Sequence, residues 1–287
     1  MANERMREYR QAIEAYLDTR FIQNLPQKTL FEAMRYSLLA GGKRIRPVLV
    51  LEFARLCGGD WSKALPFAAA LEMVHTYSLI HDDLPCMDND DYRRGRLTNH
   101  KVYGEATAVL AGDGLLTAAF AEIALAEIPS KARIDAVGVL SQCAGELGMV
   151  GGQILDLEGE TRSLTADEVR TVHRLKTGCL ISAACRLGVL AGGGSAEQLN
   201  AAAVYAEGLG LAFQLRDDML DVLGDDKKLG KSTHSDENKS TFVTLYGLDV
   251  CETLVQNETN KAVSALHVFD DNEFLVQLAM DLAKRDF

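Results

Sequence analysis

The chain has 287 residues, 47% of them hydrophobic, and is long enough to bury a large core as one big domain or two small ones. Its formal net charge of −11 argues against nucleic-acid binding, because that function needs a basic face. The six cysteines contain no CxxC pair, which is typical of reduced thiols in a cytoplasmic protein and not of a zinc site or a disulfide framework.

A helical pattern runs through nearly the whole chain, with only five prolines to interrupt it. It predicts helices over 4–20, 28–39, 47–57, from a cap at Ser62 to Asp82, and over 105–127, 131–147, 167–190, 196–223, 240–256 and 259–284. No alternation of β-branched residues suggests a sheet. We therefore expect one all-α domain over residues 1–287. We expect no secretory signal, because the N-terminal segment has no apolar h-region. We expect no stable membrane insertion, because no uncharged apolar run reaches roughly 20 residues.

The first acidic cluster, HDDLPCMD (81–88), follows an apolar segment. Carboxylates at the end of an otherwise buried helix are better placed to line a cavity than to solvate a surface. An EF-hand is a poor alternative, because a loop starting at Asp88 would have Arg93 where glycine is required. Pro85 must distort or end the helix before Asp88.

The second cluster, QLRDDMLD (214–221), ends a predicted helix. Asp217 and Asp221 are four residues apart, so they lie on one helical face and repel each other. A single cluster of this kind is usually a solvated face, but two of them embedded in apolar sequence favour a divalent cation between them. Carboxylate oxygens suit Mg²⁺, which keeps waters and binds through a few carboxylates plus substrate phosphates.

Basic residues are concentrated in short segments, GGKRIRP (41–47), RRG (93–95), KTG (176–178) and KKLGK (227–231). Each alone would be a solvated helix end, but together with the acidic clusters they suggest two diphosphate sites, one of them reached through Mg²⁺. The segment from Gly224 to Ser232 has one residue too many for a P-loop, and Gly208-Leu209-Gly210 lacks the third glycine of a dinucleotide fingerprint.

Seven motifs, in this order, resemble those of bacterial short-chain trans-isoprenyl diphosphate synthases, the farnesyl and geranylgeranyl diphosphate synthase family. They are GGKRIRP (41–47), HTYSLIHDDLPCMDNDDYRRGRLTNH (75–100), GGQILDL (151–157), HRLKTG (173–178), FQLRDDMLD (213–221), GKSTHSD (230–236) and KSTF (239–242). The resemblance implies the isoprenoid synthase fold, a single large helical bundle with a central cavity. It also implies a cytoplasmic, homodimeric, Mg²⁺-dependent transferase that joins isopentenyl diphosphate to an allylic diphosphate and releases diphosphate.

The resemblance also implies roles for matching residues. The metal ligands would be Asp82, Asp83, Asp88, Asp217, Asp218 and Asp221. The contacts to the allylic diphosphate would be Arg93, Lys176 and Lys231. The isopentenyl diphosphate site would contain Gly42, Lys43, Arg46, His75 and Arg94. The cavity around the developing carbocation would contain Thr177, Gln214, Gln153 and Phe213.

Product length is expected to depend on Tyr77, five residues before Asp82, where the resemblance places the floor of the elongation pocket. A bulky aromatic there resembles synthases that stop at C15, although Tyr77 could equally be a core residue and Ser78 opens space beside it. A C20 product therefore stays an alternative. His234 stands where the family usually has glycine in the GKxxGSD loop, and histidine disfavours backbone angles that glycine permits, so we expect this departure to affect closure of the loop over the allylic diphosphate. Val243 stands where a proline is frequent in the family.

Two other functions are weaker alternatives. A terpene cyclase shares metal-triggered ionisation but needs no second diphosphate site. A regulatory subunit of a heteromeric synthase tends to lose one metal motif, whereas both are present here. The apolar stretch 105–127 is expected to be a buried or a subunit-interface helix.

Overall fold

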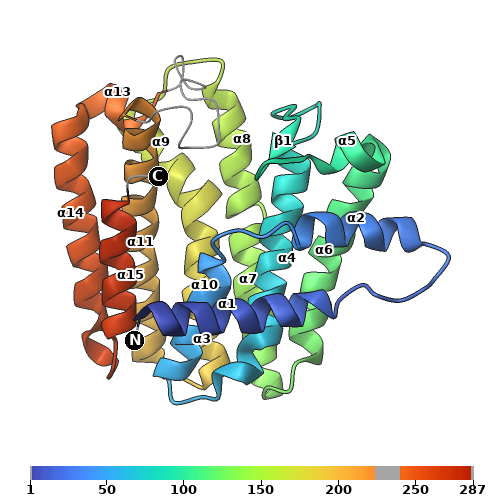
Figure 1. Ribbon diagram of the computed structural model, residues 1–287. Coiled ribbons are helices and arrows are strands. Elements are labelled where there is room, and N and C mark those ends of the chain that lie inside the picture. Colours follow the sequence, from blue (N-terminus) through green and yellow to red (C-terminus); the bar gives the residue numbers. More distant parts are fainter. Residues whose placement is uncertain (1, 224–239, 286–287) are drawn as a thin grey trace.

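The computed structural model describes residues 2–223 and 240–285, and within them nearly all secondary structure is helical (Figure 1). The first half consists of α1 (Ala2–Asp18), α2 (Lys28–Leu38), α3 (Ile45–Leu56), η1 (Trp61–Ala64), α4 (Leu65–Asp82), β1 (Tyr92–Arg93), β2 (Arg96–Leu97), α5 (Asn99–Tyr103) and α6 (Glu105–Leu125). The second half consists of α7 (Ser130–Ala144), α8 (Met149–Gly159), α9 (Ala166–His173), η2 (Arg174–Gly178), α10 (Cys179–Gly192), α11 (Ala196–Leu223), α13 (Phe242–Tyr246), α14 (Leu248–Ala265), η3 (Leu266–Val268) and α15 (Glu273–Lys284).

The all-α prediction is confirmed, and most helix boundaries lie within three residues of those expected. The prediction that Ser62 caps a long helix is wrong. Asp60 is the cap, because its carboxylate accepts the backbone N–H of Ser62 at 3.0 Å and starts the short turn η1 before α4. The predicted break between residues 256 and 259 is also wrong, because α14 continues to Ala265 and the chain turns at 266–272 instead.

The helices surround a core in which α4 is buried along most of its length. α4 packs against α3, α6 and α10, and α11 packs against α10 and α14. α1 lies across the outside of the bundle, over α3 and α4 (Figure 1). The C-terminal ends of α4 and α11 lie at the same end of the molecule, the upper end in Figure 1. The fold therefore brings the two acidic clusters to one end of the bundle.

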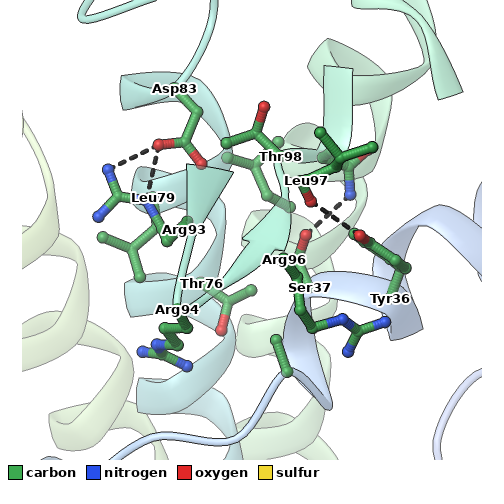
Figure 2. Close-up of a pocket in the computed structure, with 13 residues that line it drawn as sticks. Tyr36, Ser37, Thr76, Leu79, Asp83, Arg93, Arg94, Arg96, Leu97 and Thr98 are labelled. Atoms are coloured by element: carbon green, nitrogen blue, oxygen red, sulfur yellow. Dashed lines mark hydrogen bonds and ion pairs between the residues drawn. The ribbon is translucent and has the colours of Figure 1, made fainter. Parts of the chain in front are cut away.

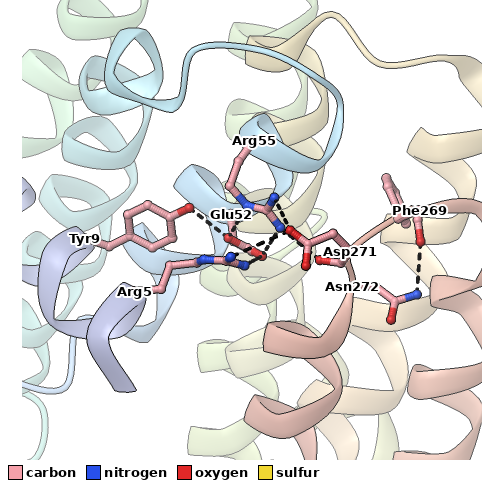
Figure 3. A network of polar contacts seen from close by, with 7 residues as sticks. All are labelled: Arg5, Tyr9, Glu52, Arg55, Phe269, Asp271 and Asn272. Atoms are coloured by element: carbon pink, nitrogen blue, oxygen red, sulfur yellow. Dashed lines mark hydrogen bonds and ion pairs between the residues drawn. The ribbon is translucent and has the colours of Figure 1, made fainter. Parts of the chain in front are cut away.

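A polar network fastens α1 and the α14–α15 connection to α3 (Figure 3). In Figure 1 the α14–α15 connection lies at the lower end of the molecule, away from the acidic clusters. The buried carboxylate of Glu52 accepts hydrogen bonds from Tyr9 at 2.8 Å, Arg5 at 3.2 Å and Arg55 at 2.8 Å. Arg55 also donates to Asp271 at 2.7 Å. All members are partnered, so this network ties α1 and the α14–α15 connection to the core without contributing to the acidic end.

Two helical stretches, Glu105–Leu125 and Ala166–Gly192, are long and apolar enough to cross a membrane by length and composition. Helices in the core of a soluble protein meet the same criterion, and both stretches are partly buried in the bundle. They are therefore weak evidence for a membrane span.

Candidate active site

The first acidic cluster forms where α4 ends and the chain turns back on itself. α4 ends at Asp82, and the backbone N–H of Asp88 donates to the carbonyl oxygen of Asp82 at 2.9 Å. Asn89, with a φ of 53°, adopts the left-handed conformation that asparagine tolerates better than most residues. The turn brings Asp88 next to Asp82, although the two positions would be about 120° apart on an ideal helix.

The electrostatics at Asp82 favour a cation. Burial raises the pKa of its carboxyl. The carboxylate of Asp88 raises that pKa further, whereas the nearby ammonium group of Lys176 lowers it. The folded protein thus holds two carboxylates close together in a partly dehydrated place, where a divalent cation would relieve their repulsion.

Asp83 is bound by the hairpin that follows the cluster. Burial raises the pKa of Asp83 to about 6, even though the guanidinium of Arg93 lowers it. The Arg93 Nε donates to Asp83 Oδ1 at 2.6 Å (Figure 2). This carboxylate is therefore already neutralised by an arginine, in contrast to Asp82.

The hairpin carries two arginines that have different partners. Tyr92 pairs with Leu97 and Arg93 with Arg96, and the central residues Arg94 and Gly95 both have positive φ, as a type I′ turn requires. Arg94 donates to the carbonyl oxygen of Gly41, and Arg93 reaches Asp83. Figure 2 shows both beside a cavity of about 30 Å³ between α2, α4 and the hairpin, with room for one or two waters.

The second acidic cluster lies on the last turns of α11, and its carboxylates have separate partners. Asp217 accepts hydrogen bonds from Arg285 and, at 3.3 Å, from the Gln214 side chain. Asp218 is less exposed and accepts the backbone N–H of Phe242 at 2.9 Å. Asp217 is therefore directed toward Arg285 at the end of α15, and Asp218 toward the start of α13.

A π-helical turn, η2, carries the lysine and threonine that the resemblance singles out. Lys176 forms an ion pair with Asp156 of α8 at 2.6 Å. A Cβ at Gly152, which also lies on α8, would be 2.3 Å from the Lys176 backbone nitrogen. Only glycine therefore lets α8 approach η2 this closely, which gives GGQILDL a packing role in addition to the expected role of Gln153.

Thr177, Gln214 and His173 form one hydrogen-bonded group. The Gln214 Oε1 lies 3.1 Å from both the Thr177 hydroxyl and the His173 Nδ1. Burial lowers the pKa of His173, but its contacts with Asp218 and Gln214 outweigh that effect, so the pKa is raised. The group joins η2 and α9 to α11, and the predicted juxtaposition of Thr177 and Gln214 is present.

A cationic group lies between α3, α4 and the hairpin. Arg46 approaches the His75 Nε2 at 3.5 Å, and burial, together with Arg46 and Arg94, holds the pKa of His75 well below its usual range. Burial also lowers the pKa of Lys43, Arg46 and Arg94. A Cβ at Gly42 would be 2.9 Å from the Arg94 guanidinium, so this glycine makes room for it. Positive charges that are partly desolvated and close together favour an anionic ligand.

Arg44, within the same motif, has a different role. Its side chain is 1% exposed, donates to Glu72 at 2.5 Å and also to the carbonyl oxygen of Leu38 at 2.9 Å. Arg44 therefore anchors the α2–α3 connection, which carries Lys43 and leads into the first turn of α3, where Arg46 lies.

The remaining predicted residues lie as follows. Tyr77 is buried on α4. Its ring and the His81 ring are arranged edge to face, with their centroids 5.7 Å apart. Ser78 donates to the His75 carbonyl oxygen at 2.9 Å. The buried Gln153 Nε2 has no hydrogen-bond partner among the residues that the structure describes. The Arg285 guanidinium lies 3.9 Å from the Phe213 ring centroid.

Asp221 is partly buried on α11, whereas Lys231 and His234 lie outside the described residues. Sequence reasoning did not identify Asp156, His173 or Arg285 as site residues. Asp156 and His173 could have been found from the sequence, because they lie in the motifs GGQILDL (151–157) and HRLKTG (173–178). Arg285 lies in none of the seven motifs.

The carboxylates fit Mg²⁺ by their donor chemistry. Among residues 2–223 and 240–285, no three His, Cys, Asp or Glu side chains converge into a complete metal site. A cation that keeps several waters and takes further oxygens from substrate phosphates needs no such cage. The raised pKa of Asp82 beside Asp88 supports this fit.

The chain is similar to known proteins along most of its length. A model of the polyprenyl synthetase family matches residues 27–272. The chain is 51% identical over 250 residues to a farnesyl diphosphate synthase of Geobacillus stearothermophilus, covering 85% of this chain and 84% of that protein. It is 44% identical to geranylgeranyl pyrophosphate synthase 7 of Arabidopsis thaliana, covering 96% and 81%. The solved structure of an FPP/GFPP synthase from Zymomonas mobilis superposes with a TM-score of 0.88 at 35% identity, covering 97% and 98%.

Proposed function

The chain belongs to the polyprenyl synthetase family, and on that premise we propose that it is a farnesyl diphosphate synthase. It condenses isopentenyl diphosphate with dimethylallyl diphosphate and then with geranyl diphosphate to give (2E,6E)-farnesyl diphosphate. We further propose that a single domain of this kind spans the chain. The observation that carries the product assignment is the 51% identity to a farnesyl diphosphate synthase, against 44% to a geranylgeranyl diphosphate synthase.

The allylic diphosphate is assigned to the acidic end, between α4 and α11. Lys176 and Arg93 are the cations placed to bind the departing diphosphate, and both are held in position by carboxylates, Asp156 and Asp83. Thr177 and Gln214 present oxygen atoms close by and stabilise positive charge on the allyl group without attacking it. The allylic C–O bond breaks as diphosphate leaves, and the π electrons of isopentenyl diphosphate form the new C–C bond. The released diphosphate then accepts the proton that is lost, which forms the new double bond.

Asp82, Asp88 and Asp217 are the carboxylates that would hold Mg²⁺, with Asp83, Asp218 and Asp221 bound directly or through water. When bound, Mg²⁺ neutralises the charge that develops on the leaving diphosphate. The residues assigned to isopentenyl diphosphate are the cationic group of Lys43, Arg46 and Arg94 with the neutral His75. Three cations close together can bind a diphosphate directly, without a metal, and burial, which lowers the pKa of Arg46 and Arg94, strengthens their interaction with an anion.

Product length is assigned to Tyr77. Its ring is held at the His81 edge, and His81 is itself fixed by α6, with Nε2 3.0 Å from the Val109 carbonyl oxygen. A Cβ at Gly112 would be 2.1 Å from that same nitrogen. Tyr77 is thus part of a tightly packed floor between α4 and α6.

Tyr77→Ala should shift the main product from C15 to C20 or longer, because removal of the ring opens space below the growing chain. The measurement is chain-length analysis of dephosphorylated products by gas chromatography. Tyr246→Ala, at a half-exposed position on α13, is the control and should leave the C15 product unchanged. An unchanged product distribution in Tyr77→Ala would place the floor elsewhere.

The test of the proposed function is product analysis of the purified protein. It is incubated with Mg²⁺, isopentenyl diphosphate and, separately, dimethylallyl or geranyl diphosphate. A dominant C15 alcohol after dephosphorylation supports the proposal, and a dominant C20 alcohol replaces it with a geranylgeranyl diphosphate synthase. A cyclic hydrocarbon would indicate a cyclase, and activity only with an added synthase would indicate a regulatory subunit.

We also propose a homodimer formed through α6 and its neighbours. α6 packs with one face on α4 yet leaves large apolar side chains exposed, and α7 and α8 continue this surface. The exposed residues are Val109, Leu110, Leu125, Ile134, Leu147, Val150 and Ile154. An apolar surface spread over three successive helices and the α7–α8 connection, which carries Leu147, is typical of a subunit interface.

Leu110→Lys should convert a dimer to a monomer, because it places a charge among these apolar residues. The measurement is light scattering coupled to size-exclusion chromatography at matched concentrations. Ile22→Lys, in the exposed α1–α2 connection, should remain dimeric. A wild-type chain that elutes as a monomer would contradict the proposal.

A further inference from the structure

His173 ends α9 in a position that reaches two residues of the second acidic motif at once. Its Nδ1 lies 3.1 Å from the Gln214 Oε1, and its Nε2 lies 3.6 Å from the Asp218 Oδ2. Its ring stacks on Phe242 at 5.3 Å with an interplanar angle of 25°. The side chain is largely buried, with 18% of its surface exposed.

The pattern of partners fixes the orientation of the Gln214 amide. Its oxygen accepts a hydrogen bond from the Thr177 hydroxyl and also faces the His173 Nδ1. Because an amide oxygen can only accept, Nδ1 must carry the hydrogen. Its nitrogen donates to Asp217 Oδ2 at 3.3 Å. A flipped amide would oppose its NH₂ to the Nδ1 hydrogen and its oxygen to the Asp217 carboxylate, losing both favourable contacts.

The other side of the imidazole faces Asp218. The same Asp218 oxygen accepts the Phe242 backbone N–H at 2.9 Å, and the Phe242 ring covers the imidazole. The rotation of the histidine ring is therefore restricted by one carboxylate and one aromatic face. A ring held in this way can direct Nδ1 at a single acceptor.

We propose that His173 is a positioning residue for prenyl transfer, which keeps the Gln214 amide oxygen directed to Thr177 while the amide nitrogen holds Asp217. This inference rests on the proposed function. It assigns to His173 no contact with substrate: its effect passes through Gln214. Small displacements of a group that stabilises developing charge reduce turnover strongly, so the role predicts a loss in kcat larger than any change in KM.

The test is a double-mutant cycle between His173 and Gln214, read as kcat for C15 formation. His173→Phe retains an aromatic ring on Phe242 but removes both nitrogens, and should lower kcat about 10- to 100-fold. In a Gln214→Leu background the same change should lower kcat less than about 3-fold, because the group through which it acts is already absent. His267→Phe, at an exposed histidine, is the control and should keep kcat.

A second pair of variants separates positioning from packing. His173→Asn places an amide N–H near the wild-type position of Nδ1 and should retain most of the wild-type kcat that His173→Phe loses. His173→Gln places the amide N–H near the wild-type position of Nε2 and should have a kcat as low as that of His173→Phe. Equal losses of kcat in both Gln214 backgrounds, or equal kcat for the Asn and Gln variants, would overturn the proposal. If His173→Phe does not fold, the Asn and Gln pair decides. Wild-type protein that forms no prenyl product would overturn the proposed function and this inference together, whereas additive losses in an active enzyme would overturn only this one.

Discussion

Asp82→Asn should lower kcat by about 10²- to 10³-fold while leaving the protein folded. The substitution replaces a carboxylate beside Asp88 with a neutral amide of nearly the same shape. It removes a hard anionic oxygen where Mg²⁺ would bind, so the Mg²⁺ concentration needed for half-maximal activity should also rise. Steady-state turnover, measured over a Mg²⁺ series with both substrates saturating, gives both quantities.

Stability in EDTA should not fall in this variant. The pKa of Asp82 is raised in the folded protein, so the fold disfavours the charged carboxylate, and its contribution to stability decreases as pH rises through that pKa. A neutral amide removes this penalty near pH 7, and Tm should be equal to or above that of the wild type.

Asp91→Asn is the matched control for Asp82→Asn. It removes one negative charge three residues beyond Asp88, but its carboxylate pairs with Lys101 at 2.9 Å and is 56% exposed. Its turnover should stay within about 2-fold of the wild type, since an exposed ion pair contributes little. Near-normal turnover in Asp82→Asn would contradict the metal assignment of the first cluster.

The sequence predicted that the carboxylates of the first cluster lie at the end of a helix. It did not predict the turn that brings Asp82 and Asp88 together. Helical periodicity located the end of α4, and Pro85 indicated that the helix stops near it. The convergence of Asp82 and Asp88 depends on a backbone hydrogen bond between the two residues and on the left-handed Asn89. This turn conformation depends on tertiary packing around the hairpin, so the order of residue types along the chain does not predict it.

The π-helical turn η2 was not predicted either, because it also depends on tertiary packing. A continuous helix over 167–190 was the natural prediction, because nothing in the sequence RLKTG forbids α-helix. The contact with Gly152 of α8 holds the wider turn, and it sets the position of Lys176 relative to Asp156. His173 was missed as a site residue for a related reason: its partners Gln214 and Asp218 are about 40 residues away and become neighbours only in the bundle.

Arg44→Met should destabilise the protein by about 3–5 kcal/mol. It leaves the Glu72 carboxylate, whose side chain is 3% exposed, in the core without the guanidinium 2.5 Å away. For a chain of this size the change corresponds to a Tm lower by roughly 6 °C or more. Chemical denaturation followed by circular dichroism measures it, and Lys131→Ala, which breaks an exposed pair, should cost less than about 0.5 kcal/mol.

Arg44→Met combined with Glu72→Leu distinguishes the stability of this pair from its function. With both charges removed, the buried penalty disappears, and the double variant should be more stable than Arg44→Met alone. Its KM for isopentenyl diphosphate should nevertheless be higher than that of the wild type, as in Arg44→Met, because Arg44 fixes the connection that carries Lys43 and leads into the first turn of α3, where Arg46 lies. Equal stability of Arg44→Met and the wild type would show that water reaches Glu72. A double variant with normal KM would show that Lys43 and Arg46 are positioned without Arg44, by the hairpin contact of Arg94 with Gly41 instead.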